Sequence, residues 1–207
     1  MLTSLTMTDF LNETASSSPA PGGGSASALA ASLGTALTSM VCRLTISKKK
    51  YANVQSEMEE VLKKSEELRV KFTAIINEDA TAFNKVMTAF GLPKETDDEK
   101  AARFAAIQET TKSATLVPLK LIELCEEAIG LVKIIAEKGN QNSRSDSGVA
   151  ALMIQAGCEG AALNVKINLL SIQDPTFVGQ IREKLQVYFG KVYSLSQEIL
   201  NEFKMLM

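Results

Sequence analysis

Apolar residues recur at helical spacing along most of the chain, and no segment alternates between apolar and polar positions as a strand would. The longest helix is expected from about Val54 to Phe90, where Gly91-Leu92-Pro93 is typical of a helix end. A helix of that length spans about 55 Å, which is long for a single copy of so short a chain. We therefore expect a homodimer that packs through its long helices.

Turn-forming residues separate the remaining helical segments. Proline inside a helix removes a hydrogen bond and crowds the preceding turn, so we expect Pro118 to kink or break its helix. The predicted segments are about Thr8–Ser16, Ser25–Ile46, Asp97–Lys138 with that interruption, Asp146–Leu170, and a last helix from Asp174-Pro175 to about Met205. Together they predict an all-α fold, an up-and-down bundle of five to six helices forming one domain over residues 1–207.

The segment from Ser25 to about Ile46 differs from the other helices because it carries no charge before Arg43. A helix that is polar on no side is expected to be buried. Its small residues follow one another at spacings of three and four, which places them on one face: Ser25, Ala28, Ser32, Ala36 and Ser39. Such a stripe would let another helix approach closely.

Composition narrows the class of protein. The 22 basic and 24 acidic residues give a net charge of −2, which argues against a nucleic-acid partner. No apolar run reaches the roughly 20 residues needed to span a bilayer, and the N-terminus lacks the regions of a signal peptide, so no membrane partner is expected. Cys42, Cys125 and Cys158 are widely separated and form no CxxC, so we expect buried free thiols in a cytoplasmic protein.

The sequence contains no histidine, and this constrains its chemistry most. Histidine is the usual general base near neutral pH and the commonest transition-metal ligand. Its absence rules out Ser-His-Asp and Cys-His mechanisms and argues against a zinc-bound water, so no metal is expected. Proton transfer must fall to aspartate, glutamate, lysine, tyrosine or the backbone.

One acid, Asp79, lies on a helix face that is otherwise apolar. Steps of three and four place it in line with Phe72, Ile76, Phe83, Val86 and Phe90. A carboxylate among buried aromatic rings costs several kcal/mol unless it is paired, hydrogen-bonded or protonated, and desolvation raises its pKa unless donors oppose it. Such an acid is a candidate for catalysis. The alternative is a structural acid that caps another helix or pairs with a basic side chain.

A glycine-rich loop, residues 19–25, is the second candidate. Gly22, Gly23 and Gly24 expose backbone N–H groups just before a helix N-terminus, which suits an anion or a polar ring. The loop lacks the GK[ST] of a Walker A motif and does not follow a strand as a dinucleotide fingerprint does. The alternative is a tight turn capped by Ser25.

Two further groups carry basic residues. Lys48 and Lys49, with Lys50 and Tyr51, follow a helix C-terminus, where they either favour the helix dipole or bind an anion. Arg144-Ser145-Asp146 precedes another helix: Ser145 or Asp146 would serve as an N-cap, and Arg144 offers a fork suited to carboxylates.

Two asparagines, Asn164 and Asn168, share a helix face with Asp146. Asp146 and Asn164 are 18 residues apart, about 27 Å along a helix, so one chain cannot bring both to one small ligand. We expect the asparagines to make buried hydrogen bonds between helices.

Four motifs occur in order along the chain: PAPGGGSASALAASLG, EDATAFNKVMTAFGLPKETDDEKAAR, GNQNSRSDSGVAA and ALNVKINL. With them the whole chain resembles the cyclodeaminase half of formiminotransferase-cyclodeaminase and the related stand-alone methenyltetrahydrofolate cyclohydrolases. The resemblance implies an all-helical dimeric domain that acts on one-carbon adducts of tetrahydrofolate without a metal or redox cofactor. It also implies that Asp79, in EDATAF, is the catalytic acid.

The resemblance leaves two reactions open. A cyclohydrolase adds water to 5,10-methenyltetrahydrofolate and gives 10-formyltetrahydrofolate; a cyclodeaminase closes 5-formimidoyltetrahydrofolate to the methenyl form and releases ammonia. A stand-alone chain favours the cyclohydrolase, whereas a formiminotransferase on a separate chain would favour the cyclodeaminase. In either reaction we expect the glycine loop to hold the pterin or tail, and Arg144, Lys48 and Lys49 to attract the glutamate tail. A non-catalytic folate-binding or scaffold protein is the third alternative.

Overall fold

The computed structural model describes residues 1–46 and 48–204, without the side chains of residues 203 and 204. Within these residues the regular structure is entirely helical, as predicted. The predicted end of the last helix near Met205 lies outside the described residues. The elements are η1 (Leu2–Ser4), α1 (Met7–Thr14), α2 (Gly23–Ile46), η2 (Lys49–Val54), α3 (Gln55–Phe90), α4 (Asp97–Lys138), η3 (Gln141–Ser143), α5 (Arg144–Leu169) and α6 (Pro175–Lys204).

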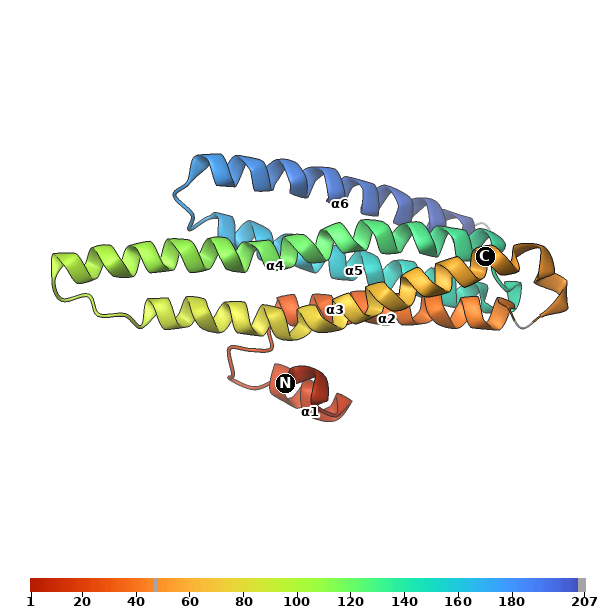
Figure 1. Cartoon of the computed structure of the whole chain (residues 1–207), viewed down its shortest axis with the longest axis horizontal. Helices are drawn as coiled ribbons and strands as arrows, with labels where there is room; N and C mark the ends of the chain where they lie inside the picture. The colour runs from red at the N-terminus through yellow and green to blue at the C-terminus, as the bar shows by residue number, and fades with distance from the viewer. Residues whose placement is uncertain (47, 205–207) are drawn as a thin grey trace.

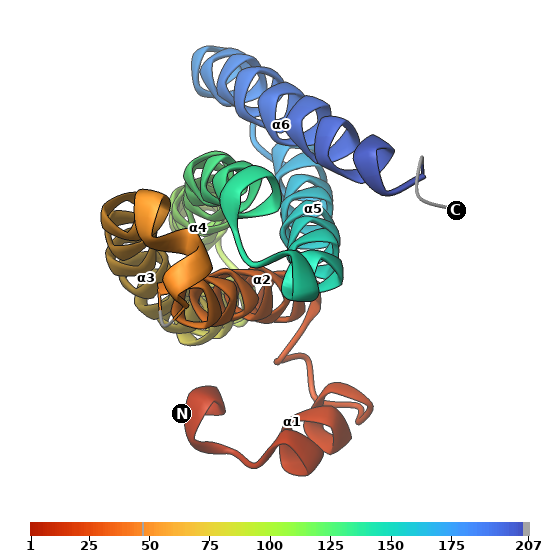
Figure 2. The same ribbon diagram turned by 90° about the vertical axis from the view of Figure 1, so that its right-hand side faces the viewer.

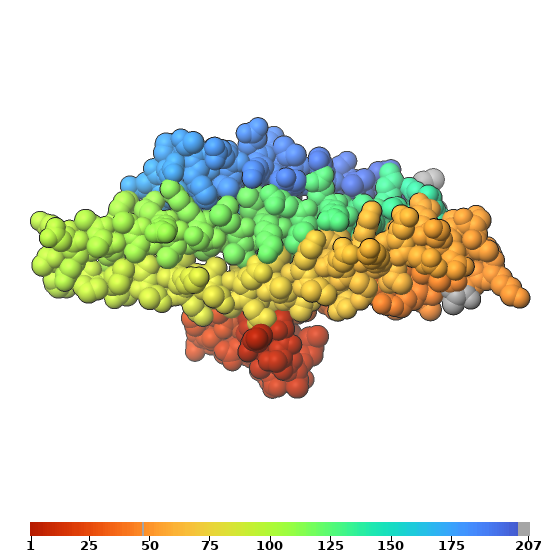
Figure 3. Space-filling model, in the orientation of Figure 1, coloured from red at the N-terminus to blue at the C-terminus, as the bar shows by residue number. Residues whose placement is uncertain are grey.

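Four long helices, α2 to α5, run up and down side by side, and α6 lies against α4 and α5 (Figure 1). The predicted up-and-down helical bundle is therefore confirmed. The N-terminal unit of η1 and α1 protrudes below α2 and α3 and packs against the bundle through Phe10 (Figures 2 and 3). It is tied to α3 by the backbone N–H of Leu2, which donates to Oδ1 of Asn77 at 2.7 Å.

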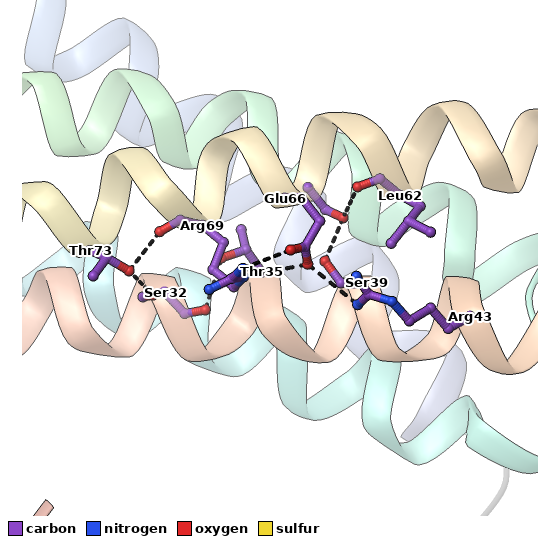
Figure 4. Close-up of polar contacts among 9 residues, drawn as sticks. Ser32, Thr35, Ser39, Arg43, Leu62, Glu66, Arg69 and Thr73 are labelled. Atoms are coloured by element: carbon purple, nitrogen blue, oxygen red, sulfur yellow. Dashed lines mark hydrogen bonds and ion pairs between the residues drawn. The ribbon is translucent and has the colours of Figure 1, made fainter. Parts of the chain in front are cut away.

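Small polar residues join α2 to α3, as the stripe on α2 predicted. The hydroxyl oxygens of Ser32 and Thr73 lie 3.0 Å apart, and those of Ser39 and Ser65 lie 2.8 Å apart (Figure 4). Because these side chains are short and satisfy one another, the two backbones approach closely without leaving unpaired polar groups. The same register, about two turns further toward the start of α2, brings Ser25 to Asp79.

At the edge of this helix pair, Glu66 accepts hydrogen bonds from two arginines. Nη2 of Arg69 lies 2.7 Å from one carboxylate oxygen, and Nη1 of Arg43 lies 3.4 Å from the other (Figure 4). Hydrogen bonds from Arg69 first, then from Ser39, and last from Arg43 lower the pKa of Glu66 to about 2. The cluster is partly exposed, so it adds only modestly to stability.

Helix α4 continues through Pro118 as one helix of 42 residues, so the predicted break at Pro118 is wrong. A proline in a helix interior costs about 3 kcal/mol. Pro118 is buried, and so is its neighbour Leu119. Packing of these residues against the rest of the bundle offsets the lost hydrogen bond.

The apolar stripe of α3 is buried along only part of its length. Phe72 and Ile76 belong to the core, but Phe83 is 38% exposed and Phe90 is 47% exposed. The α3–α4 hairpin extends past the ends of α2 and α5, and this part of the stripe lies on the extension (Figure 1). The expectation of a fully buried stripe is therefore wrong for its second half.

Helix α2 was expected to be buried on all sides, and this is also wrong. One side packs on α3, α4 and α5, but Leu33 and Leu44 are 44% and 40% exposed on the other. By length and composition, α2 and residues 141–169 are apolar enough to cross a membrane, and half of each stretch is buried inside the bundle. The buried half of each stretch is apolar because it packs in the core of the bundle. The other half leaves apolar side chains on the outer surface of α2 and α5.

Candidate active site

Asp79 on α3 lies beside the first turn of α2. Oγ of Ser25 is 2.9 Å from Oδ2 of Asp79 and 3.0 Å from the carbonyl oxygen of Ile76, so its single proton is shared between two acceptors. The backbone N–H of Ser25 also bonds the carboxyl group. Asp79 thus caps α2, where the positive end of the helix dipole favours an anion.

Gly24 makes this contact possible. A Cβ at Gly24 would collide with the Asp79 carboxylate, whereas at Gly23 it would lie 3.4 Å from Nδ2 of Asn164 and at Gly22 it would meet little. Gly24 therefore leaves room for the Asp79 carboxylate at the start of α2. The sequence suggested exposed N–H groups in this loop but not this steric requirement.

Burial raises the pKa of Asp79, and the hydroxyl and backbone N–H of Ser25 oppose that rise only in part. Among the residues that the structure describes, no basic side chain lines the space in front of the acid. The raised pKa brings the carboxyl group closer to the neutral range in which an acid can both give and accept a proton. The sequence left open whether Asp79 is a structural acid that caps a helix or a candidate catalytic acid. The structure gives it both features, because Asp79 caps α2 and also faces a cavity.

The cavity has a volume of about 200 Å³. Its walls come from the glycine loop, α3, α4 and α5: Pro19, Ala20, Gly22, Gly23, Gly24, Asp79, Ala82, Phe83, Val86, Ala114, Pro118, Asn164 and Asn168. Sites for drug-sized ligands occupy about 300–1,000 Å³. This cavity is thus suited to a bicyclic ring, with any long tail lying outside it.

Asn164 and Asn168 line this cavity and do not join helices as expected. Nδ2 of Asn164 donates to the carbonyl oxygen of Gly160, four residues back on its own helix, at 2.9 Å. This bond orients the amide and leaves Oδ1 of Asn164 as an acceptor in the wall. The four-residue spacing in ALNVKINL was the signal for these two residues, because it places both amides on one face.

Pro118 also lines the cavity, together with Ala114 on the preceding turn of α4. Because proline has no N–H, the carbonyl of Ala114 lacks the donor that it would have in an ordinary helix. The apolar wall therefore includes a backbone acceptor. Sequence reasoning treated Pro118 only as a helix breaker and missed this role.

The predicted basic residues lie at the other end of the bundle. Lys48 and Lys49 follow the C-terminus of α2, a helix of 24 residues that spans about 36 Å from the glycine loop. The backbone N–H of Asn140 donates to Oγ1 of Thr45 at 2.9 Å, which fixes the start of α5 beside this end of α2. Within one chain the structure does not bring these residues to Asp79.

The Arg144-Ser145-Asp146 group lies at that same end, within the first turn of α5. Helix α5 begins at Arg144, so Ser145 and Asp146 lie inside the helix and their predicted N-cap role is wrong. Nη2 of Arg144 lies 3.3 Å from a carboxylate oxygen of Glu202 on α6, so its fork is engaged within the fold.

A larger hollow of about 600 Å³ lies between α5 and α6. Leu169, Leu170, Leu185 and Phe189 give it an apolar lining, and Lys166 and Arg182 supply its charges. Its lining within residues 1–46 and 48–204 includes no carboxyl group such as Asp79 gives to the smaller cavity.

Comparisons with known proteins show which family the chain resembles. The sequence profile described as Formiminotransferase-cyclodeaminase matches residues 6–187. A methenyltetrahydrofolate cyclohydrolase from Methylorubrum extorquens is 48% identical over 199 residues, covering 96% of each chain. The formimidoyltransferase-cyclodeaminase of Sus scrofa is 36% identical over 85% of this chain, which spans 32% of that longer protein.

A solved structure gives the same result for the fold. The formiminotetrahydrofolate cyclodeaminase of Thermotoga maritima superposes with a TM-score of 0.89 at 30% identity, covering 100% of this chain and 99% of that one. The resemblance predicted from the four motifs is confirmed in sequence and in structure. The chain belongs to the formiminotransferase-cyclodeaminase family.

Proposed function

We propose that this protein is a methenyltetrahydrofolate cyclohydrolase, which hydrolyses 5,10-methenyltetrahydrofolate to 10-formyltetrahydrofolate. The observation that carries the proposal is Asp79, a carboxyl group of raised pKa and the one ionisable group among the described residues that line a small cavity. The Methylorubrum cyclohydrolase supports it, because the two chains match along nearly their whole length.

The substrate is a cation whose positive charge is shared by N5, the bridging carbon and N10. As a carboxylate, Asp79 stabilises this cation across the cavity that it faces. The cation in turn favours the ionised form of Asp79 when substrate binds, which offsets the effect of burial. A carboxylate that is partly destabilised before binding is thereby prepared for a cationic ligand.

The proton balance assigns Asp79 two steps. Asp79 accepts a proton from the attacking water as the new C–O bond forms at the bridging carbon, giving a neutral carbinolamine. It then donates this proton to N5 as the C–N5 bond breaks, while the carbinolamine hydroxyl loses its own proton to become the formyl oxygen. One proton leaves to solvent in each turnover. The hydroxyl of Ser25 lies 2.9 Å from Oδ2 of Asp79 and orients the carboxyl group for this exchange.

The rest of the cavity wall offers both hydrogen-bond donors and hydrogen-bond acceptors to a pterin. The N–H groups at the start of α2 provide donors to the carbonyl and ring nitrogens of the ligand. The acceptors are Oδ1 of Asn164 and the carbonyl of Ala114, which suit the amino group and ring N–H. Phe83 and Val86 provide the apolar surface against which a flat ring packs.

A second candidate is formimidoyltetrahydrofolate cyclodeaminase, which the likeness to the Thermotoga structure favours. In that reaction N10 attacks the formimino carbon, and the departing nitrogen leaves as ammonia after protonation. Asp79 would donate that proton, so the same residues serve either reaction. A formiminotransferase on a separate chain would then supply the substrate.

One pair of assays separates the candidates. Purified protein is supplied with methenyltetrahydrofolate, and the loss of its absorbance is compared with spontaneous hydrolysis. It is then supplied with formimidoyltetrahydrofolate, and ammonia is measured. Turnover in the first assay alone supports the cyclohydrolase, and ammonia release supports the cyclodeaminase. Folate binding without either activity would indicate a non-catalytic protein.

The role of Asp79 is tested by Asp79→Asn beside Glu78→Gln. Glu78 is the neighbouring acid, but it lies on the surface and pairs with Lys120 at 3.0 Å. We expect Asp79→Asn to lower kcat by about 10²–10⁴-fold, the usual contribution of a general acid–base group. Glu78→Gln should keep nearly full turnover. Equal activity in the two variants would remove Asp79 from the mechanism.

We also propose that the working form is a cytoplasmic homodimer that packs through its long helices. Two observations support this: Cys42, Cys125 and Cys158 are buried free thiols, and α2 and α5 retain apolar outer surfaces. Light scattering of the purified protein measures the molar mass directly.

A further inference from the structure

The apolar stripe on α3 leads from Asp79 out of the cavity and along the α3–α4 hairpin. Phe83, Val86 and Phe90 follow the acid at steps of four, three and four, on one face of the helix. Phe83 and Val86 line the cavity, but Phe83 is also 38% exposed, and Phe90 beyond them is 47% exposed. Because Phe83 belongs both to the cavity wall and to the surface, the cavity opens toward the extended part of the hairpin (Figure 1).

Helix α4 runs beside this stripe in the opposite direction (Figure 1). Its residues Pro118 and Ala114 line the cavity, and Ile107 and Arg103 follow on the same face at steps of seven and four. Arg103 is half-buried and contacts Phe90, the last residue of α3. The cavity wall therefore continues along both helices as far as Arg103. The name hairpin track is used below for Phe83, Val86, Phe90 and Arg103.

Arg103 is held in a fixed position at the far end of the track. Its Nε and Nη2 donate to the carbonyl oxygen of Phe90 at 3.2 and 3.0 Å, and its guanidinium lies over the Phe90 ring, 5.6 Å from the ring centroid. These contacts use one edge of the guanidinium group. The two protons of Nη1 and the second proton of Nη2 form the other edge, which suits a carboxylate.

The acids nearest to Arg103 on the hairpin have partners of their own. Glu99 caps α4 by accepting from the backbone N–H groups of residues 95 and 96, at 2.8 and 3.0 Å. Asp97 pairs with Lys100 at 2.9 Å. Within residues 1–46 and 48–204, the ion pairs do not include Arg103. Its charge is therefore available to an anion that comes along the track.

The spacing of the track matches the tail of the substrate. At about 1.5 Å per residue, Phe83 lies about 6 Å along α3 from Asp79 and Phe90 about 16 Å. Bond lengths of about 1.3–1.5 Å place the glutamate carboxylates of a folate about 11–14 Å from its bridging carbon, with the benzoyl ring between them. When that carbon faces Asp79, the carboxylates come within reach of the Arg103 side chain.

Resting on the proposed function, we propose that the hairpin track binds the p-aminobenzoylglutamate tail of the folate and that Arg103 selects for its glutamate. The fused ring lies in the cavity against Phe83 and Val86, and the benzoyl ring packs between the exposed edge of Phe83 and Phe90. The free edge of Arg103 donates two parallel hydrogen bonds to a glutamate carboxylate. This ligand accounts for a track that is apolar near the cavity and cationic at its end.

Two substrates that differ only in the glutamate test the role of Arg103. They are 5,10-methenyltetrahydrofolate and 5,10-methenyltetrahydropteroate, whose chain ends at the benzoate carboxylate and is too short to reach Arg103. We expect Arg103→Gln to raise KM for the folate about tenfold, the usual contribution of a charged hydrogen bond, with little change in kcat. The KM for the pteroate should stay the same. Arg103→Lys keeps the charge without the fork and should give an intermediate KM for the folate.

Lys85→Gln is the matched control for the loss of charge. Lys85 is exposed on α3 but lines a separate hollow with Glu78 and Glu109, on another face of the hairpin. This change should leave KM unaltered for both substrates. If Arg103→Gln raised both KM values equally, Arg103 would act only by holding the hairpin in place. If it changed neither, Arg103 would not touch the substrate. Either result overturns the proposal.

Phe90→Ala tests the aromatic part of the track. Both substrates carry the benzoyl ring, so we expect the KM for each to rise severalfold. Tyr193→Ala is the control, because Tyr193 is 47% exposed on α6, away from the cavity, and its removal should leave both KM values unchanged. Light scattering of the Phe90→Ala variant identifies the competing ligand. A fall in molar mass would assign the exposed stripe to a contact between copies of the chain and overturn the proposal.

Failure of the proposed function has its own signature. If the wild type converted neither methenyltetrahydrofolate nor formimidoyltetrahydrofolate, that function would be overturned before any variant is compared. If the wild type converted the folate and the pteroate with the same KM, the function would stand and only the hairpin track would be overturned.

Discussion

Oγ of Ser25 lies 2.9 Å from Oδ2 of Asp79 and connects the first turn of α2 to the acid on α3. Ser25 belongs to the series of small residues that lets α2 and α3 pack closely, together with Ser32 and Ser39. Ser39 also meets an acid, Glu66, but that carboxylate is paired with arginines, whereas the acid beside Ser25 faces a cavity. The packing that builds the bundle thus also fixes the position of the proposed catalytic group.

Ser25→Ala should move the pH dependence of the reaction. The Ser25 hydroxyl lowers the pKa of Asp79, so its removal raises that pKa further. We expect the acidic limb of the pH profile of kcat to shift to higher pH. Loss of the buried hydrogen bond should also cost about 1 kcal/mol in the free energy of unfolding. Ser32→Ala removes a similar contact with Thr73 and should lower stability without moving the profile.

Gly24→Ala should disrupt the site more than its size suggests. A Cβ here would collide with the Asp79 carboxylate, so α2 and α3 must separate or the acid must turn away. We expect a loss of about 1–3 kcal/mol of stability, as for other overpacked positions, and a large fall in kcat. Gly130→Ala is the control, because nothing lies within 4 Å of an added Cβ at Gly130. That change should stabilise its helix by about 0.5–1 kcal/mol. Equal effects of the two substitutions in calorimetry and turnover would show that the contact is unimportant.

The sequence predicted the all-helical bundle because its long segments repeat apolar residues at one period and end at clear turns. It failed where packing decides the outcome. The break expected at Pro118 did not occur, because buried neighbours hold the helix together. Phe83 and Phe90 are exposed because the α3–α4 hairpin is longer than the helices that would cover it.

The candidate site was predictable only where it depends on the pattern of residues along one segment and not on packing between helices. Asp79 was identifiable as the one acid on an apolar face, and the glycine loop by its composition. Asn164 was singled out but assigned to hydrogen bonds between helices, and the carbonyl of Ala114 was missed, because both roles depend on which helices meet around the cavity. The basic residues at 48, 49 and 144 were grouped with Asp79 by the family resemblance, and the length of α2 separates them from it within one chain.

Asp79→Asn should stabilise the protein at neutral pH. Burial raises the pKa of Asp79 above its value in the unfolded chain. Below the unfolded pKa both states are protonated and the group has no effect; above it, ionisation is more costly in the folded state. The variant avoids this cost, so its Tm should exceed that of the wild type at pH 7. The difference should shrink toward pH 3. A Tm difference that is independent of pH would show that Asp79 ionises as easily in the fold as outside it.

Pro118→Ala, in the part of the cavity wall that α4 forms, should raise the stability of the protein but weaken its binding of folate. Alanine supplies the N–H that proline lacks, so the carbonyl of Ala114 gains its ordinary helical donor. We expect the free energy of unfolding to rise by about 1–3 kcal/mol, a large part of the usual cost of an interior proline. The same hydrogen bond turns the carbonyl away from a bound pterin, so KM for the folate should increase. Pro175→Ala is the control, since Pro175 occupies the first position of α6, where no helical bond is lost. If Pro118→Ala raised Tm and left KM unchanged, the carbonyl of Ala114 would have no part in binding.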